Sequence, residues 1–270
     1  YTRDMDRSIE ARRELEGDLR KALGRDDQLT LHFQPLHSAA SSAMTGVEVL
    51  LRWKHPTRGW VGPDVFVPIA EEVGLIHELG EWVLGEACRQ TRDWPVSTVA
   101  VNVSALELSK PGYAMRVANI LLRTGADPAK IELEVTESTF TAQHGECQSN
   151  IRALRELGLR FALDDFGTGF SSLSRLQQLD VDRIKIDRSF VQGFGKNGSD
   201  EAIVQAIIDL AKASGLKTTA EGVETTTQAD RLRGIGCDEL QGFVFDRPMP
   251  AEDIERMWKR KGLHIVKPAG

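Results

Sequence analysis

The stretch IRALRELGLRFALDDFGTG, residues 151–169, decides the fold. Its first part carries apolar residues at helical intervals and ends at Gly158, which predicts a helix closed by a glycine C-cap. A short β-rich run follows at residues 160–163 and leads into two adjacent aspartates and a glycine-rich turn. A helix, a strand and a polar strand end in this order are typical of a parallel α/β fold.

The same unit recurs along the chain. Short β-rich runs, each followed by polar turn residues, alternate with stretches of helical periodicity. The candidate strands are centred on Leu29–Gln34, Val47–Trp53, Val99–Val103, Ile131–Thr136, Arg160–Leu163, Arg183–Ile186, Lys217–Thr219 and Glu239–Phe243. These are eight runs, the number of strands in a TIM barrel. We therefore predict an α/β fold of the TIM-type (β/α)8 class.

The length suits one barrel-sized domain. A chain of 270 residues with 41% hydrophobic content buries a large core but leaves little room for a second domain. We assign residues 25–260 to the barrel, 1–24 to a lead-in helix exposed to solvent and 261–270 to a polar tail. The charged lead-in helix is interpreted either as docked on the barrel or as a signalling linker from a preceding domain. The missing initial methionine indicates a fragment of a longer protein.

Charge, cysteine and apolar content exclude several classes of protein. The net charge of -6 and pI near 5.6 give no broad basic field, which argues against long nucleic acid as a partner. Cys88, Cys147 and Cys237 are odd in number and lack CxxC spacing, so neither a disulfide framework nor a thiolate zinc site is expected. No apolar run reaches the roughly 18 residues of a membrane span. A cytoplasmic, reducing location is the simplest interpretation.

Polar side chains lie in or just beyond seven successive β-rich runs, from the second to the eighth. They are Glu48, Asn102, Glu134, Asp164 with Asp165, Lys185, Glu221 and Gln241. In a TIM barrel the carboxyl ends of the strands open on one face, so the fold would gather these groups in one bowl. One acid at a strand end is usually a helix cap or a surface charge, but that interpretation explains the whole set poorly.

Carboxylates gathered in this way would repel one another unless cations intervened. Oxygen ligands favour magnesium, manganese or calcium, and two ions bridged by one carboxylate recur in phosphoester cleavage. Asp164 is the candidate bridge. Neighbouring strand residues face opposite ways, so Asp165 can share its site only at a strand end, which the following glycines predict. Lys185 should point into the barrel, either as a structural ion pair or to position the attacking water.

Together these motifs resemble the EAL family from about residue 19 to residue 258. One departure is visible, because the signature triplet has Val49 in place of alanine; its extra methyl groups crowd the strand packing but remove no ligand. The matching stretches are Phe33-Gln34-Pro35, Glu48-Val49-Leu50-Leu51-Arg52-Trp53, Asn102-Val103-Ser104-Ala105, Glu134-Val135-Thr136-Glu137, Asp164-Asp165 through Ser172, Lys185-Ile186-Asp187, Glu221-Gly222-Val223-Glu224 and Gln241-Gly242-Phe243.

The resemblance implies a phosphodiesterase that hydrolyses cyclic di-GMP to linear pGpG with two Mg²⁺ or Mn²⁺ ions, and with Ca²⁺ as an inhibitor. It assigns the metal ligands as Glu48, Asn102, Glu134 and Asp164 for one ion and Asp164, Asp165 and Glu221 for the other. It names Lys185, Glu221 and Glu48 as catalytic, with Lys185 orienting the water. It assigns substrate contacts to Gln34, Arg52 and Gln241, and to Glu137 the anchoring of the loop 166–172.

The resemblance also implies one antiparallel strand in the barrel, a homodimer to which the loop 166–172 contributes, and an upstream diguanylate-cyclase-like GGDEF domain in a parent protein that is cytoplasmic or membrane-anchored. Two rival functions stay open. One is a catalytically silent EAL domain that binds cyclic di-GMP as a receptor. The other is a TIM-barrel enzyme for another phosphorylated substrate, such as a sugar phosphate. The role of Glu132, on the same strand face as Glu134, is not explained by the sequence.

Overall fold

The computed structural model describes residues 2–25, 27–137, 139, 145–167, 180–194 and 198–260. The strands are β1 (Leu29–Ser38), β2 (Met44–His55), β3 (Gly59–Val61), β4 (Thr98–Asn102), β5 (Ile131–Thr136), β6 (Arg160–Phe166), β7 (Arg183–Ile186), β8 (Lys217–Ala220), β9 (Glu239–Leu240) and β10 (Met249–Pro250). The helices are α1 (Thr2–Ala22), α2 (Pro63–Glu72), α3 (Ile76–Thr91), α4 (Ala105–Leu108), α5 (Tyr113–Thr124), the 3-10 turn η1 (Pro128–Lys130), α7 (Gly145–Glu156), α9 (Arg188–Gln192), α10 (Gly198–Ala213), α11 (Thr226–Gly234) and α12 (Ala251–Arg260).

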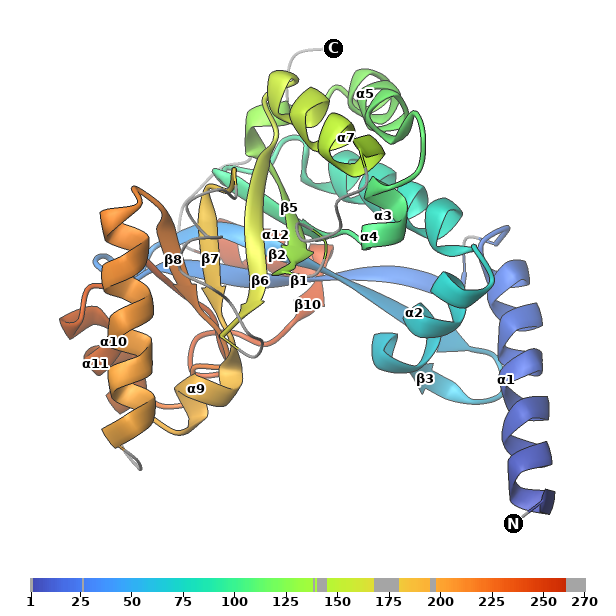
Figure 1. The fold of residues 1–270 in the computed structure, drawn as a ribbon, viewed down its shortest axis with the longest axis horizontal. Coiled ribbons are helices and arrows are strands. Elements are labelled where there is room, and N and C mark those ends of the chain that lie inside the picture. The colour runs from blue at the N-terminus through green and yellow to red at the C-terminus, as the bar shows by residue number, and fades with distance from the viewer. Residues whose placement is uncertain are drawn as a thin grey trace.

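Eight of the strands close into a barrel, as predicted (Figure 1). Their order is β1-β9-β8-β7-β6-β5-β4-β2, and the pairing of β1 with β2 closes the ring. Strand β1 is antiparallel to both β2 and β9, whereas the neighbours from β2 through β9 are parallel. The single antiparallel strand in the ring is therefore confirmed. The carboxyl ends of the parallel strands open on one face, where the predicted site residues lie.

Apolar strand residues and the surrounding helices form the main core. Val99, Leu133, Phe161 and Ile184, from four consecutive parallel strands, are each no more than 1% exposed. The glycine C-cap predicted at Gly158 is present, with a φ of 98° and hydrogen bonds that close the last turn of α7. The predicted alternation of strands and helices thus builds this core.

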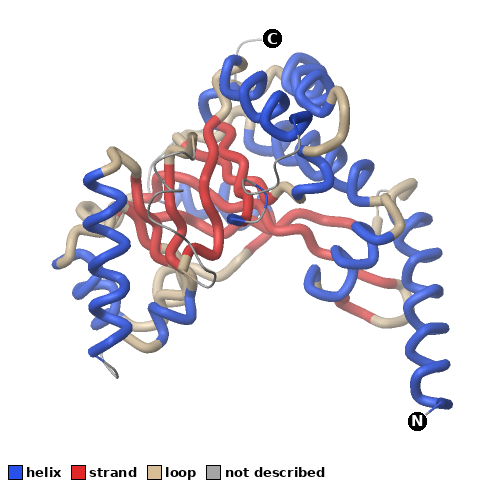
Figure 2. The backbone as a smooth tube through the Cα atoms, in the orientation of Figure 1, coloured by secondary structure: helices blue, strands red, loops and turns tan. Residues whose placement is uncertain are grey.

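A second hydrophobic core lies beside the barrel. Strands β1 and β2 continue past the ring as a two-stranded ribbon that reaches α1, α2 and β3 (Figures 1 and 2). Leu19 of α1, Trp53 of the ribbon and Phe66 of α2 are fully buried there. Of the two interpretations of the lead-in helix, the structure shows docking, on the second core, through the apolar side that carries Leu15 and Leu19.

The strands differ from the sequence prediction at three places: β3 and β10, the two terminal strands of the sheet, and the end of β9. The short strands β3 and β10 were not predicted, because two or three residues carry no recognisable alternation. The last barrel strand ends at Leu240 rather than Phe243, although Gln241 still donates its N–H to Ala220 at 2.9 Å.

No helix in the described ranges is both long and apolar enough to cross a bilayer. The predicted tail, residues 261–270, lies outside the described residues.

Candidate active site

Four of the predicted acids surround one lysine in the barrel mouth. Lys185 Nζ lies 2.6 Å from Glu221 Oε1, 2.7 Å from Glu134 Oε2, 3.1 Å from Asp164 Oδ1 and 3.7 Å from Glu48 Oε1. The lysine is 2% exposed. The interior position predicted for Lys185 is confirmed, and the structure shows the ion-pair arrangement.

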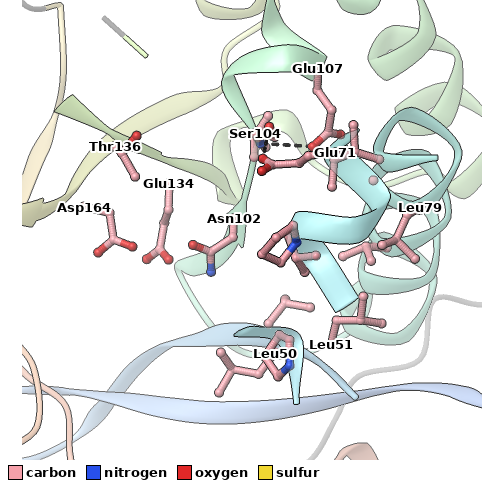
Figure 3. Close-up of a pocket in the computed structure, with 18 of the residues that line it drawn as sticks. Leu50, Leu51, Glu71, Leu79, Asn102, Ser104, Glu107, Glu134, Thr136 and Asp164 are labelled. Carbon is pink, nitrogen blue, oxygen red and sulfur yellow. Dashed lines mark hydrogen bonds between the residues drawn. The ribbon is translucent and has the colours of Figure 1, made fainter. Parts of the chain in front are cut away.

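Strand register explains why residues far apart in sequence meet here. Asn102 at the end of β4 lies opposite Glu134 of β5, and Thr136 of β5 lies opposite Asp164 of β6. Figure 3 shows Asn102, Glu134 and Asp164 directed toward the same space. Because side chains alternate between the two faces of a strand, polar residues facing the mouth share each strand with apolar residues facing the helices.

A backbone irregularity separates Asp164 from Asp165. The register between β6 and β7 shifts between Leu163 and Phe166, and Asp165 has a φ of 52°. A positive φ is costly for a residue other than glycine and is found preferentially at functional sites. The strand end predicted from the glycines that follow Asp165 is confirmed, since β6 ends at Phe166. The distortion, rather than the strand end alone, lets both adjacent aspartates line the same pocket.

Amides hold Glu48 in place. Gln241 Nε2 donates to Glu48 Oε2 at 2.5 Å and to Gln34 Oε1 at 3.1 Å, while Asn102 Nδ2 donates to Glu48 Oε1 at 3.1 Å. Gln34 is fixed in turn by a 3.3 Å hydrogen bond to the carbonyl oxygen of Asp246. Gln34 and Gln241, predicted to contact substrate, therefore also orient a candidate metal ligand.

Burial drives the acids to different protonation states. Burial alone would raise the pKa of Glu48, but Lys185 and the donated hydrogen bonds hold it below its usual value. Burial raises the pKa of Glu134 well above its usual value and that of Glu221 to about 7. One ammonium therefore does not balance the carboxylates around it, and added positive charge would let all of them ionise.

The donor set fits divalent cations that prefer oxygen. Glu134 Oε2, Asp164 Oδ1 and Glu221 Oε1 are buried oxygens whose close partner among the described residues is the Lys185 ammonium. Mg²⁺ or Mn²⁺ would be coordinated by these oxygens and would balance their negative charge. As the side chains stand, no three His, Cys, Asp or Glu residues in the described ranges are arranged to hold a metal ion, since the acids converge on the lysine.

A pocket of about 560 Å³ adjoins these groups. It runs from Asp164 and Asp165 past Asn102 to Arg52 on the ribbon, and helix α2 forms its far wall. This volume lies in the range of small-ligand sites. Arg52, predicted to contact phosphate, lies at the rim and donates to the carbonyl oxygen of Leu51 at 3.0 Å.

The lining residues that the sequence analysis did not assign to the site include Glu71, Ser104 and Glu107. The Ser-x-x-Glu spacing of the last two is a capping-box signal that could have placed them at the start of α4. Nothing in the sequence marks Glu71, because a charged residue near a helix end is ordinary.

Two further acids, Glu132 and Glu137, lie in β5 or directly after it but outside the acid cluster around Lys185. Glu137 lies just after β5, but most of the loop that it is expected to anchor, from residue 168 onward, is outside the described residues. Glu132, left unexplained above, accepts a 2.8 Å hydrogen bond from buried Arg183, which also contacts Glu239 and Thr219. This ionic cluster lies inside the barrel below Lys185 and is structural.

The EAL domain family model matches residues 16–248. The chain belongs to the EAL family. The match takes in the last turns of α1, the ribbon and the whole barrel, so nearly all of the second core lies within the EAL domain, together with the candidate site in the barrel mouth.

Two relatives of this EAL domain are named as phosphodiesterases. It is 44% identical over 259 residues to the bifunctional diguanylate cyclase/cyclic di-GMP phosphodiesterase MucR of Pseudomonas aeruginosa, covering 94% of this chain and 38% of MucR. It is 41% identical over 260 residues to the cyclic di-GMP phosphodiesterase NbdA of the same organism, covering 94% of this chain and 33% of NbdA. The EAL domain thus spans roughly a third of these curated relatives.

A solved structure agrees with the fold. The complex of the PaMucR phosphodiesterase with c-di-GMP superimposes on the EAL domain with a TM-score of 0.84 and 46% sequence identity, covering 89% of this chain and 99% of that one.

Proposed function

We propose that this EAL domain is a metal-dependent phosphodiesterase that opens cyclic di-GMP to linear pGpG. The observation that carries the proposal is the convergence of four carboxylates on one buried lysine, which leaves negative charge for divalent cations to balance. EAL phosphodiesterases are generally metal-dependent. The similarity to MucR, NbdA and a c-di-GMP complex supports the choice of substrate.

The ligand set that we propose has two parts that share Asp164. Two Mg²⁺ or Mn²⁺ ions, when bound, would lower the pKa of water and offset charge on the phosphate. Ca²⁺ is proposed to inhibit. One ion would be held by Glu48, Asn102, Glu134 and Asp164, and the other by Asp164, Asp165 and Glu221.

The chain's own residues would then position substrate and water. Lys185 carries three N–H donors, of which one can hold the attacking water while the others stay on its carboxylates. Arg52 would bind a phosphate through its guanidinium at the pocket rim. Gln34 and Gln241 would support the ligand from β1 and the end of β9 while they orient Glu48.

The test is a hydrolysis assay with product identification. The purified chain is incubated with cyclic di-GMP and Mg²⁺ or Mn²⁺, with and without chelator, and pGpG is measured by chromatography. We expect pGpG with metal and none with chelator. Glu48→Ala should reduce turnover to the chelator background, whereas Glu146→Ala, which removes an exposed acid on α7, should not.

Each alternative has its own result in this assay. A chain that binds cyclic di-GMP but forms no pGpG is a silent receptor. A chain that leaves cyclic di-GMP intact but cleaves another phosphoester is a different hydrolase. Full activity in chelator would contradict the metal-dependent mechanism.

The wider setting is proposed on the same basis. We propose that residues 25–260 form the catalytic barrel, that α1 leads in from an upstream GGDEF-like domain, and that the parent protein works in the cytoplasm or anchored to a membrane. The protein is proposed to act as a homodimer, to which the loop 166–172 and its anchor Glu137 contribute.

A further inference from the structure

Helix α2 has two working sides. Its residues Phe66 and Ile69 are buried in the second core, against α1 and the ribbon. The opposite side, with Asp64, Pro68 and Glu71, lines the pocket beside the candidate metal site. This division follows from the helical period, because residues four apart lie on the same side. Helix α2 is therefore one of the elements, with Ile76 and Leu79 of α3, through which the second core borders the pocket.

The Glu71 side chain contacts the segment that follows barrel strand β4. Its Oε1 accepts a hydrogen bond from Ser104 Oγ at 2.6 Å (Figure 3). A hydroxyl-to-carboxylate distance in this range is typical of a strong, charge-assisted hydrogen bond. The contact joins α2 to the segment that follows β4, which is 33 residues later in the chain.

Ser104 lies two residues after Asn102, a proposed metal ligand. The backbone N–H of Ser104 donates to Glu107 Oε2 at 3.0 Å, and the N–H of Val103 donates to the carbonyl oxygen of Glu134 at 2.9 Å. The segment is thus held by β5 on one side, by its own capping box below, and by Glu71 on the pocket side. Without Glu71, the Ser104 hydroxyl would lose its one carboxylate partner among the described residues.

We infer that Glu71 is a positioning residue that sets the orientation of Asn102 for metal binding through Ser104. The inference rests on the proposed metal-dependent function. Groups that orient a metal ligand from outside the coordination sphere typically change metal affinity by about 10–100-fold when removed. Because Glu71 lies on α2 and contacts Ser104, a displacement of α2 would change both the pocket wall and the segment that carries Asn102.

The test measures Mn²⁺ affinity by calorimetry, apart from turnover. Glu71→Ala and Ser104→Ala should each weaken Mn²⁺ binding by about 10-fold or more. Glu71→Gln should stay within about 3-fold of the wild type, because its amide oxygen can still accept from the Ser104 hydroxyl. The double variant Glu71→Ala/Ser104→Ala should bind no more weakly than Ser104→Ala alone, since the serine variant already removes the contact with Glu71, along with the hydroxyl that accepts from the Leu106 N–H.

Glu72→Ala is the matched control. Glu72 is the next residue on α2, carries the same charge, and pairs with Arg12 of α1 at 2.6 Å on the exposed surface. Its loss should leave Mn²⁺ affinity within about 3-fold, because exposed ion pairs contribute little. Thermal unfolding verifies that every variant is folded. If Glu71→Ala does not fold, the Mn²⁺ affinities of Ser104→Ala and Glu71→Gln are compared instead, and only Ser104→Ala should show the loss.

The outcomes separate the two proposals. A wild-type chain that binds no Mn²⁺ would overturn the proposed function and this inference together. A wild-type chain that binds Mn²⁺, with Glu71→Ala or Ser104→Ala binding it equally well, would overturn the positioning role alone. Losses that multiply in the double variant would show that the two residues act separately and would also overturn it.

Discussion

Replacing Lys185 by methionine should destabilise the metal-free protein more than any exposed lysine substitution. Methionine keeps a long unbranched side chain but removes the ammonium that contacts four carboxylates at 2.6 to 3.7 Å, in a site where the lysine is 2% exposed. Removing one partner of a buried ion pair typically costs about 3–5 kcal/mol. We expect a loss of that size in the free energy of unfolding, measured by urea denaturation in chelator at pH 8.

The loss should shrink at lower pH. The pKa of Lys185 lies well above its usual value of 10.5, so its own stabilisation is constant between pH 5 and pH 8. Without it, the pKa values of Glu134 and Glu221 rise further above that of an unfolded glutamate, and the folded protein holds protons that the unfolded chain releases. Stability of the variant should therefore fall as the pH rises through this window.

Lys217→Met is the control, because Lys217 is exposed at the start of the neighbouring strand β8. Its effect should stay within about 0.5 kcal/mol of the wild type. If Lys185→Met unfolded at the same urea midpoint as Lys217→Met at pH 8, the lysine would not be the counter-charge of the acid cluster, and the electrostatic reasoning would be refuted.

Three further predictions concern single side chains. Burial raises the pKa of Glu107 to about 8, so the folded protein keeps a proton that an unfolded glutamate releases near 4.5, and stability should fall as the pH rises from 5 to 8. Glu107→Gln keeps the capping acceptor, and its urea midpoint should fall less over that range. Equal falls would contradict this. Val49→Ala, which restores the family's signature triplet, removes two buried methyl groups beside Phe33 and Val101. It should lower the free energy of unfolding, measured by urea denaturation, by about 2 kcal/mol. Mn²⁺ affinity measured by calorimetry should not change, and a loss of affinity would assign Val49 a role in the metal site. Arg52→Lys keeps the charge but not the bidentate geometry, so steady-state kinetics should show that KM for cyclic di-GMP rises by about 10-fold with little change in kcat. An unchanged KM would show that Arg52 does not contact the substrate.

The barrel and its polar rim could be predicted from local patterns. The sequence of residues 151–169 predicts a helix, a cap, a strand and a polar strand end, and each of these predictions depends on residues only a few positions apart. Repetition of that unit implies parallel strands whose carboxyl ends share one face. Lys185 could be placed inside for the same reason, because it alternates with buried isoleucines.

The docking of α1 was undecided at the level of sequence. Its apolar residues allow either a free linker or a packed helix, and the surface that buries Leu15 and Leu19 is supplied by the second core, to which the ribbon of β1 and β2 and helix α2 contribute. The extended ribbon is itself a long-range feature, since its length depends on pairing between residues about 20 positions apart.

The amino-acid order by itself determined the family, the alternation of strands and helices, and the acids at the strand ends, because each is written in residue types at short spacing. Only the tertiary structure decided that four of those acids converge on Lys185, that a positive φ at Asp165 brings neighbouring aspartates to one pocket, and that Glu71 reaches Ser104 from another element. These features depend on strand register, backbone distortion and helix packing. Such contacts join residues that no local pattern relates.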